Sequence, residues 1–314
     1  MFDYTHLTTS VRWAIGVIFG LLLMSELILT LVSHLISEKS LKEIRLRIRT
    51  WWVIAASLLG ALIFSRVVSL VFFAFISFLA LKEYLSMIPT RRADRRVIFW
   101  GYFAISVQYF WIYVDWYTMF LIFIPVYAFL FLPLRMVLIG ETKDFLKAVS
   151  TLHWGLMMTV FALSHMAFLL NLDPGRNPAG QGAGLVLYLV LLTELNDIAQ
   201  FIWGKLFGKH KVIPKVSPNK TVEGLLGGIA TSMLLSWLMA PYLTPLQPHT
   251  AVLFGLAISL CGFFGDVSIS AIKRDIGVKD SGNTLPGHGG VLDRLDSLTY
   301  TAPVFFHLLK YFYY

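Results

Sequence analysis

The sequence has little charge and almost no cysteine. Charged residues make up 14% of its 314 positions, whereas an average soluble domain has about 25%. Hydrophobic residues make up 57%, and the mean hydropathy is +0.71. This balance excludes a soluble globular enzyme, a disordered chain and a nucleic-acid-binding module. The single cysteine, Cys261, lies in an apolar run, so neither a disulfide framework nor a multi-cysteine metal site is expected.

Long apolar runs dominate the chain. A helix needs about 20 mostly apolar residues to cross a bilayer. Ten runs approach this length, and we predict a membrane-spanning helix at each of 11–36, 51–64, 67–88, 97–114, 117–139, 150–170, 183–203, 223–243, 250–264 and 298–312. Arg66 separates the second run from the third. A hairpin near Ser65 fits best, with one long tilted helix as the alternative. The first run is too long for a cleavable signal, and no cleavage site follows it.

Basic residues are concentrated in alternate loops. With ten spans, the loops 37–50, 89–96, 140–149, 204–222 and 265–297 lie on one side and hold 20 of the 26 Lys and Arg residues. Basic loops face the cytoplasm, so both termini are expected on the opposite side. The runs 39–49 and 91–96 are interpreted as topology signals that also attract anionic lipid. We therefore expect an all-α polytopic membrane protein of about nine or ten transmembrane helices, with a polar active-site cavity facing the cytoplasm.

The first polar segment, residues 194–224, begins inside an apolar helix. Glu194 and Asp197 are three residues apart and share one helical face. Carboxylates inside a membrane helix are costly and usually face a cavity or a partner; a structural bond between helices is the alternative. A loop with five lysines follows and ends in S-P-N-K-T-V-E-G. Ser217 or Thr221 can cap the next helix there, and that helix N-terminus is also suited to bind phosphate.

The second polar segment, residues 265–296, holds five Asp, two Lys, two Arg and one His in 32 residues. It lies between two apolar runs on the predicted cytoplasmic side. Asp266, Ser270 and the pair Lys273 and Arg274 follow one another at about one helical turn. They are expected to line one side of a helix that continues out of the ninth span. A charged loop of this length has no evident structural purpose and indicates function.

The end of this segment adds a glycine-rich turn and two more carboxylates. The turn, P-G-H-G-G, allows backbone to approach a ligand closely. Asp293 and Asp296 lie three residues apart just before the last span. Oxygen ligands without cysteine favour Mg²⁺, and Lys and Arg neutralise phosphate oxygens. The segment therefore suits phosphoryl or nucleotidyl transfer. His288 is open to three roles: proton shuttle, phosphate donor or turn residue.

These residues resemble the signature of the phosphatidate cytidylyltransferase family, also called CDP-diacylglycerol synthases. The resemblance rests on Ser270-x2-Lys273-Arg274-x4-Lys279-Asp280-x5-Pro286-x-His288-Gly289-Gly290-x2-Asp293-Arg294-x-Asp296. A second region of that family is similar to three further stretches of the chain: Asn196-Asp197, Phe207-Gly208 and Ser217-Pro218-x-Lys220-Thr221-x-Glu223-Gly224. The motifs cover about a third of the chain, residues 194–296. The Asn196-Asp197-Ile198-Ala199 form departs from most bacterial members, which have Asp, then Thr or Ser, and a Tyr two residues later, and it points to a divergent bacterial subgroup.

The resemblance implies transfer of CMP from CTP to phosphatidic acid, giving CDP-diacylglycerol and pyrophosphate in phospholipid biosynthesis. It implies Mg²⁺, with K⁺ as an optional second cation, a homodimer, and a bacterial inner membrane with the active site facing the cytoplasm. The metal ligands it implies are Asp266, Asp293 and Asp296. The further catalytic residues are Lys273, Arg274 and His288. The residues implied to bind CTP or phosphate are Asn196, Asp197, Ser217, Lys220, Thr221, Ser270, Lys279, Asp280, Gly289, Gly290 and Arg294.

Three other functions compete with this interpretation. A cytidylyltransferase that acts on another lipid phosphate, such as a polyprenol phosphate, has the same features. A CDP-alcohol phosphotransferase would carry the motif D-G-x2-A-R-x8-G-x3-D-x3-D, which is absent. A transporter could use the intramembrane carboxylates, but no inverted repeat or paired broken helices are evident. We expect residues 1–182 to form an N-terminal multi-span region and residues 183–314 the catalytic region of one membrane unit.

Overall fold

The computed structural model describes residues 7–35, 37–88 and 95–314, and these are almost entirely helical. The main helices are α1 (Thr9–Leu31), α2 (Glu38–Phe64), α3 (Arg66–Met87), α4 (Arg95–Tyr113), α5 (Tyr117–Ile122), α6 (Phe129–Val137), α7 (Phe145–Leu156), α8 (Ala162–Phe168), α9 (Gln181–Phe207), α10 (Val222–Leu243), α11 (Pro248–Asp275), α12 (Leu292–Leu295) and α13 (Leu298–Tyr313). Short 3₁₀ turns occupy Ser33–Leu35, Leu169–Asn171 and Pro174–Arg176. The prediction of an all-α protein is confirmed.

Helix α2 begins at Glu38, so the stretch 37–50, predicted as a loop, is almost entirely helical instead. Residue 36 of the first predicted span and residues 91–94 of the basic run 91–96 lie outside the described residues. Each of the ten predicted spans is helical over most of its described residues. Two of them are interrupted by π-helical turns: Phe123–Ala128 joins α5 to α6, and Met157–Phe161 joins α7 to α8. Eight helices in the described chain are long and apolar enough to cross a membrane. The other two are α4, whose Tyr, Trp and Gln residues lower its hydropathy, and α13, which has 16 residues. The chain is thus a polytopic membrane protein.

The break at Ser65 separates α2 from α3, so the hairpin interpretation is confirmed. Ser65 has an extended backbone, with φ −171° and ψ 164°, and its hydroxyl accepts a hydrogen bond from the backbone N–H of Val68. This is the ordinary chemistry of a helix N-cap. Arg66 then donates from its guanidinium to the carbonyl oxygens of Ile112 and Tyr113, at 3.0 and 3.1 Å. The second and third predicted spans are therefore separate helices.

Helices α9 and α10 approach each other closely because small residues face the contact. A Cβ atom on Gly224 would lie 2.7 Å from the backbone oxygen of Gln200 and 3.0 Å from the Cα of Gly204. One helical turn later, a Cβ on Gly228 would collide with the side chain of Gln200. Small residues four positions apart commonly bring membrane helices together in this way. The contact fixes Gln200 and its neighbour Asp197 against the start of α10.

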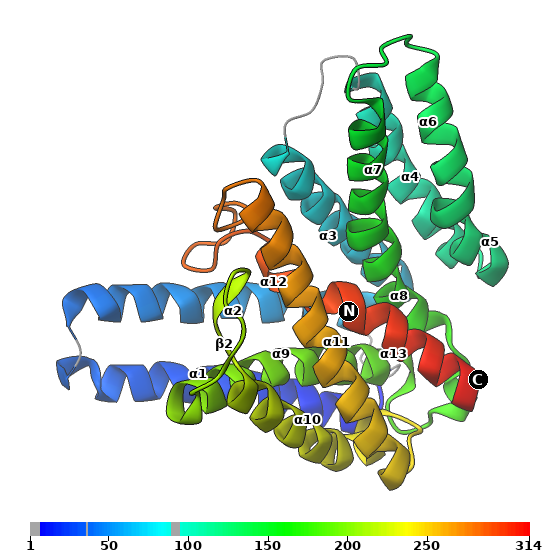
Figure 1. The fold of residues 1–314 in the computed structure, drawn as a ribbon. Helices are drawn as coiled ribbons and strands as arrows, with labels where there is room; N and C mark the ends of the chain where they lie inside the picture. Colours follow the sequence, from blue (N-terminus) through cyan, green and yellow to red (C-terminus); the bar gives the residue numbers. More distant parts are fainter. Residues whose placement is uncertain (1–6, 36, 89–94) are drawn as a thin grey trace.

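A two-stranded antiparallel ribbon connects α9 to α10. It consists of β1 (Lys211–Ile213) and β2 (Ser217–Thr221), which the sequence analysis treated as loop. The hydroxyl of Thr221 accepts a hydrogen bond from the backbone N–H of Gly224 at 3.1 Å and caps α10, as the sequence predicted for Ser217 or Thr221. Figure 1 shows the ribbon standing beside α11, close to the loop that precedes α12.

Helices α2 and α3 bring the N-terminal half of the chain to this same loop (Figure 1). The hydroxyl of Thr50 on α2 donates to the carbonyl oxygen of Pro286 at 2.7 Å. A carboxylate oxygen of Glu83, near the end of α3, accepts a hydrogen bond from the backbone N–H of Leu292 at 2.9 Å. The loop is thus enclosed by helices that are more than 190 residues away in sequence.

Candidate active site

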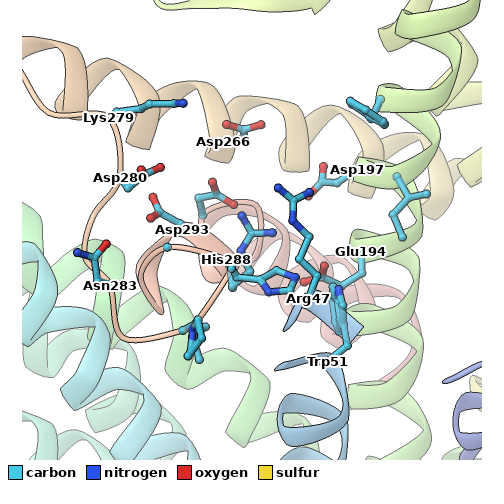
Figure 2. Close-up of a pocket in the computed structure, with 18 residues that line it drawn as sticks. Arg47, Trp51, Glu194, Asp197, Asp266, Lys279, Asp280, Asn283, His288 and Asp293 are labelled. Carbon is cyan, nitrogen blue, oxygen red and sulfur yellow. The ribbon is translucent and has the colours of Figure 1, made fainter. Parts of the chain in front are cut away.

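A large polar pocket, called here the main pocket, lies between α2, α9, α11 and the loop before α12. Its volume is about 910 Å³. Figure 2 shows carboxylates from different elements facing into it, with Asp197 on α9, Asp266 on α11, and Asp280 and Asp293 on the loop side. The lining residues that the sequence had singled out are Glu194, Asp197, Asp266, Lys279, Asp280, His288, Gly289, Asp293, Arg294 and Asp296. The two polar segments therefore meet in one cavity.

A smaller pocket of about 250 Å³, the ribbon pocket, lies beside the main pocket. Ser217, Lys220 and Thr221 line it from the ribbon side. Asp197 and Asp266 line both pockets, so they stand at the boundary between them. The hydroxyl, lysine and threonine of the S-P-N-K-T motif thus lie next to the carboxylates of the second polar segment.

Lys220 and Asp266 form an ion pair across this boundary. The Lys220 Nζ lies 2.6 Å from Asp266 Oδ2, and both side chains are mostly shielded from solvent. Lys220 also donates to Gln200 Oε1 at 3.3 Å. The hydroxyl of Ser270, one turn further along α11, donates to the other oxygen of Asp266 at 3.2 Å. These contacts hold the carboxylate of Asp266 in one orientation toward the pockets.

Asp293 is the anchor of the glycine-rich loop. Its Oδ2 accepts hydrogen bonds from the backbone N–H groups of Ser281 and Gly290, at 2.8 and 3.0 Å. Its Oδ1 pairs with Lys273 Nζ at 2.8 Å. Burial raises the pKa of Asp293, but the hydrogen bonds and the charge of Lys273 outweigh it, so the pKa lies below its ordinary value. Asp293 is therefore ionised and bound to its own loop.

The glycines of this loop are required by its backbone. Gly287 and Gly289 have φ values of +76° and +81°, in the left-handed region that favours glycine. A Cβ on Gly289 would lie 2.7 Å from Asp293 Oδ2. A Cβ on Gly290 would collide with Ser281 and with the carboxylate of Glu83. The turn thus allows a close approach of backbone to carboxylates of the protein itself.

Carboxylates outnumber cationic side chains in the lining of the main pocket, although Lys220 and Lys273 pair with two of them from outside it. Six carboxylates line it together with three cationic side chains, Arg47, Lys279 and Arg294. The pKa of Asp296 is raised well above its ordinary value, first by burial and then by the charges of Asp266 and Asp197. One oxygen of Asp197 is buried and has no hydrogen-bond partner among the described residues. Like charges held this close together favour binding of a cation.

The oxygen ligands in the pocket suit a Mg²⁺ ion whose coordination is completed by water or by substrate phosphates. In the described ranges no three His, Cys, Asp or Glu side chains are placed to hold a metal ion by themselves. Mg²⁺ is usually bound by one or two carboxylates, water and substrate phosphates rather than by a full protein cage. Asp266 and Asp296, with Asp197 beside them, offer such a partial set. Asp266 is paired with Lys220 and Ser270, and Asp293 with Lys273 and two backbone N–H groups. A cation bound at either carboxylate would therefore take the place of its lysine.

His288 belongs to the glycine-rich loop, and its side chain lies beside Trp51. The two rings meet edge to face, with centroids 5.9 Å apart, and Figure 2 shows both at the pocket wall. Burial, followed by the nearby charge of Arg294, lowers the pKa of His288 below its ordinary value. The imidazole is therefore neutral at pH 7 and can form hydrogen bonds, while positive charge in the pocket comes from Arg and Lys.

Five of the predicted site residues do not line either pocket. Asn196 is fully buried, and its side-chain oxygen accepts hydrogen bonds from Ser232 and Ser259 at 3.0 and 2.6 Å. Arg274 is exposed and donates to the carbonyl oxygen of Val216 on the ribbon. The other three are Lys273 and Gly290, which contact Asp293 directly, and Ser270, which donates to Asp266. These residues hold helices, ribbon and loop in place around the pockets.

The N-terminal half contributes residues that sequence reasoning did not place at the site. Arg47 and Trp51 on α2 line the main pocket, although the sequence analysis interpreted the basic run as a topology signal and Trp51 resembles an interface tryptophan. Glu83 holds the loop, as described above. In the C-terminal half, Gln200 and Asn283 are two further pocket residues that were not among the predicted site residues. A surplus of basic residues near Trp51 was visible in the sequence, but nothing local distinguished Arg47 from the four others in its run.

The fold and the site together define a class of protein: a polytopic membrane protein with a polar, carboxylate-lined pocket. Residues 45–312 match the family described as the Cytidylyltransferase family. The chain therefore belongs to the cytidylyltransferase family, which implies a nucleotidyltransferase. Over 298 residues it is 50% identical to the uncharacterized protein YnbB of Escherichia coli K12, covering 95% of this chain and 98% of that protein.

Relatives with an assigned activity match over a shorter length. The chain is 43% identical over 126 residues to the phosphatidate cytidylyltransferase of Staphylococcus aureus strain COL, covering 40% of this chain and 48% of that protein. It is 42% identical over 125 residues to the phosphatidate cytidylyltransferase of Staphylococcus epidermidis, with the same coverage. The match thus spans about half the length of these two relatives.

Proposed function

We propose that this protein transfers CMP from CTP to phosphatidic acid, forming CDP-diacylglycerol and pyrophosphate. The observation that carries the proposal is the meeting of the two polar segments in the main and ribbon pockets, where Lys220 and Asp266 stand on their common boundary. Membership in the cytidylyltransferase family supports an enzyme over a transporter. The matches to two staphylococcal phosphatidate cytidylyltransferases support phosphatidic acid as the acceptor.

The reaction exchanges one phosphoanhydride bond for another. An oxygen of the lipid phosphate attacks the α-phosphorus of CTP, the bond to the β-phosphate oxygen breaks, and pyrophosphate leaves. A phosphate monoester has a second pKa near 6 and is largely dianionic at pH 7, so the attacking oxygen needs no general base. The protein's task is to position two anions and to offset their charge. Lys220, Lys279 and Arg294 are placed at the pockets to do so.

Mg²⁺ belongs to the proposal because the carboxylates of Asp197, Asp266 and Asp296 line one pocket and repel one another, and a divalent cation would offset this repulsion. Asp266 and Asp296 would hold the ion, with Asp197 beside them. When bound, Mg²⁺ neutralises phosphate oxygens and the charge that develops on the pyrophosphate. Asp293 would act through the loop that it anchors. K⁺ and a homodimer stay predictions from the family resemblance.

The side of the membrane that the active site faces is also part of the proposal. Basic residues in the loops near the pockets favour a cytoplasmic active site in a bacterial inner membrane, where CTP is available. The two pockets are lined mainly by segments 194–224 and 265–296, each of which begins inside a candidate span and continues past its end.

A different lipid phosphate is the second candidate acceptor. It is favoured by the form Asn196-Asp197-Ile198-Ala199, which departs from most bacterial members of the family. The relative that matches nearly the whole chain is uncharacterized and does not assign the acceptor. The test is transfer of label from CTP, labelled on its α-phosphate, to lipid in detergent micelles with Mg²⁺. Phosphatidic acid and a polyprenyl phosphate are supplied separately at equal concentration. We expect labelled lipid with phosphatidic acid. Labelled lipid only with polyprenyl phosphate would assign the second acceptor.

A further inference from the structure

An apolar groove adjoins the main pocket on the side of α2 and α3. Its volume is about 370 Å³, within the range of about 300–1,000 Å³ that ligand pockets occupy. The lining is almost wholly apolar and is made by α2, α3 and residues 284–298, with one residue from α8 and two from α9. Its central side chains include Ile54, Leu58, Phe72, Ile76 and Leu79.

The groove and the main pocket share a wall. Trp51, Glu194, Leu285 and Arg294 line both cavities. Figure 2 shows Trp51 and Glu194 together at one end of the charged pocket. A molecule that fills both cavities must therefore have a charged head, which contacts the polar lining of the main pocket, and an apolar tail, which contacts the apolar lining of the groove.

Arg294 is suited to bind the charged head. Its Nε atom is buried and has no hydrogen-bond partner in the part of the chain that the structure describes. An unpaired buried donor is costly, and a guanidinium binds phosphate through parallel hydrogen bonds. A phosphate at the shared wall would satisfy this donor, whereas an apolar occupant alone would leave it unpaired. The indole of Trp51, apolar with a polar N–H, fits such a boundary.

The outer end of the groove reaches the lipid-facing surface. Val53 on α2 and Phe75 on α3 line the groove, and they are 62% and 55% exposed. Both helices are candidate membrane spans. A hydrocarbon chain could therefore enter sideways from the bilayer, while its head remained next to Arg294.

We propose that this groove holds an acyl chain of the lipid acceptor and that Arg294 holds the acceptor's phosphate at the wall shared with the main pocket. The inference rests on the proposed function and adds the place of the acceptor within it. The occupant is a membrane lipid with a phosphate monoester head. A second copy of the chain or an uncharged lipid would fill the groove without satisfying Arg294.

Two substitutions on α2 test the groove by kinetics. Ser57 is exposed and lines the groove, so Ser57→Trp fills it at little packing cost; the adjacent Ala56 is exposed but does not line it. Ser57→Trp is expected to raise KM for dioleoyl phosphatidic acid about tenfold, the loss of roughly two buried methylenes. KM for CTP and turnover of a short-chain dibutyryl acceptor stay unchanged. Ala56→Trp is the matched control and changes neither. Equal effects of both variants would overturn the proposal.

A binding experiment without nucleotide separates this proposal from the proposed function. Phosphatidic acid carrying a diazirine at the end of one acyl chain is photolysed with the full-length protein in micelles. Labelling is expected on peptides from 51–79 or 284–298. Excess dioleoyl phosphatidic acid should reduce it several-fold and the same excess of dioleoyl phosphatidylcholine much less, and Ser57→Trp should reduce it where Ala56→Trp does not.

The outcomes are distinct. Labelling elsewhere on an enzyme that still transfers CMP would overturn the groove and leave the function standing. Equal competition by phosphatidylcholine would overturn the role of Arg294 and the phosphate. Phosphate-selective labelling of the groove, without CMP transfer to any lipid phosphate, would support the lipid site while the proposed function fails.

Discussion

Glu83 on α3 accepts a hydrogen bond from the backbone N–H of Leu292, 209 residues later, at 2.9 Å. The same carboxylate oxygen accepts a hydrogen bond from the hydroxyl of Ser281 at 3.2 Å. Ser281 and Gly290 are in turn bound to Asp293 through their backbone N–H groups. Two buried carboxylates, one from each half of the chain, therefore hold the glycine-rich loop in its shape.

This relationship makes Glu83 a positioning residue that can be tested. Glu83→Ala removes two hydrogen bonds to a charged group, each worth about 1.5–3 kcal/mol, and is expected to lower kcat at least tenfold by loosening the loop. Glu83→Gln keeps an acceptor for Leu292 and should restore much of the loss. Steady-state transfer of CMP to phosphatidic acid measures both. Glu38→Ala, at an exposed position of α2, is the control. If Glu83→Gln were as inactive as Glu83→Ala, the carboxylate would have a role beyond positioning.

Lys220 is expected to contribute to nucleotide binding. Lys220→Ala removes the partner of Asp266 and the phosphate contact that we propose for it, so KM for CTP should rise about 10- to 100-fold, the loss expected for one charged hydrogen bond. KM for phosphatidic acid should change much less. Lys215→Ala, in the exposed turn of the same ribbon, should leave both values unchanged. An unaltered KM for CTP in Lys220→Ala would remove the ribbon from the nucleotide site.

The contact between α9 and α10 predicts a stability difference between two glycines. Gly224→Ala places a methyl group 2.7 Å from the backbone oxygen of Gln200, so the helices must separate and the variant should melt at a lower temperature. Gly60→Ala on α2 meets nothing within 4 Å and should be neutral or more stable, by about 0.5–1 kcal/mol of helix propensity. Thermal scanning of the purified protein in detergent compares them. A Gly224→Ala variant that melts with the wild type would contradict the close packing.

Much of the fold could be predicted from the sequence because its signals are local. Apolar length predicted the apolar part of every long helix, although the basic first half of α2 was predicted as a loop. Ser65 and Thr221 terminate or cap helices as their chemistry indicates. The motifs also predicted that segments 194–224 and 265–296 form the site, and the structure brings most of the predicted residues into two adjoining pockets. The ribbon at 211–221 was missed because its two short strands lie in a lysine-rich stretch without a clear alternation of apolar and polar residues.

The rest of the site could not be predicted because it depends on contacts distant in sequence. Arg47, Trp51 and Glu83 belong to apolar or basic stretches that have an adequate explanation as membrane helices and topology signals. Their part in the site arises only when α2 and α3 pack against a loop more than 190 residues away. In the same way, the contacts of Asp293 with Lys273 and the loop backbone could not be predicted from the motif. The assignment of Asp266, Asp293 and Asp296 as metal ligands stays a prediction.

The central claim is that Asp266 is part of a magnesium-dependent cytidylyltransferase site. It is tested most directly by transfer of α-labelled phosphate from CTP to phosphatidic acid, comparing wild type, Asp266→Asn and Asp275→Asn over a Mg²⁺ titration. Asp275 is an exposed residue at the end of the same helix. We expect Mg²⁺-dependent labelled lipid from wild type and Asp275→Asn, and at least about a hundredfold less from Asp266→Asn, the usual loss when a main electrostatic group of an active site is removed. Equal activity of Asp266→Asn and wild type, or transfer that is independent of Mg²⁺, would contradict the claim.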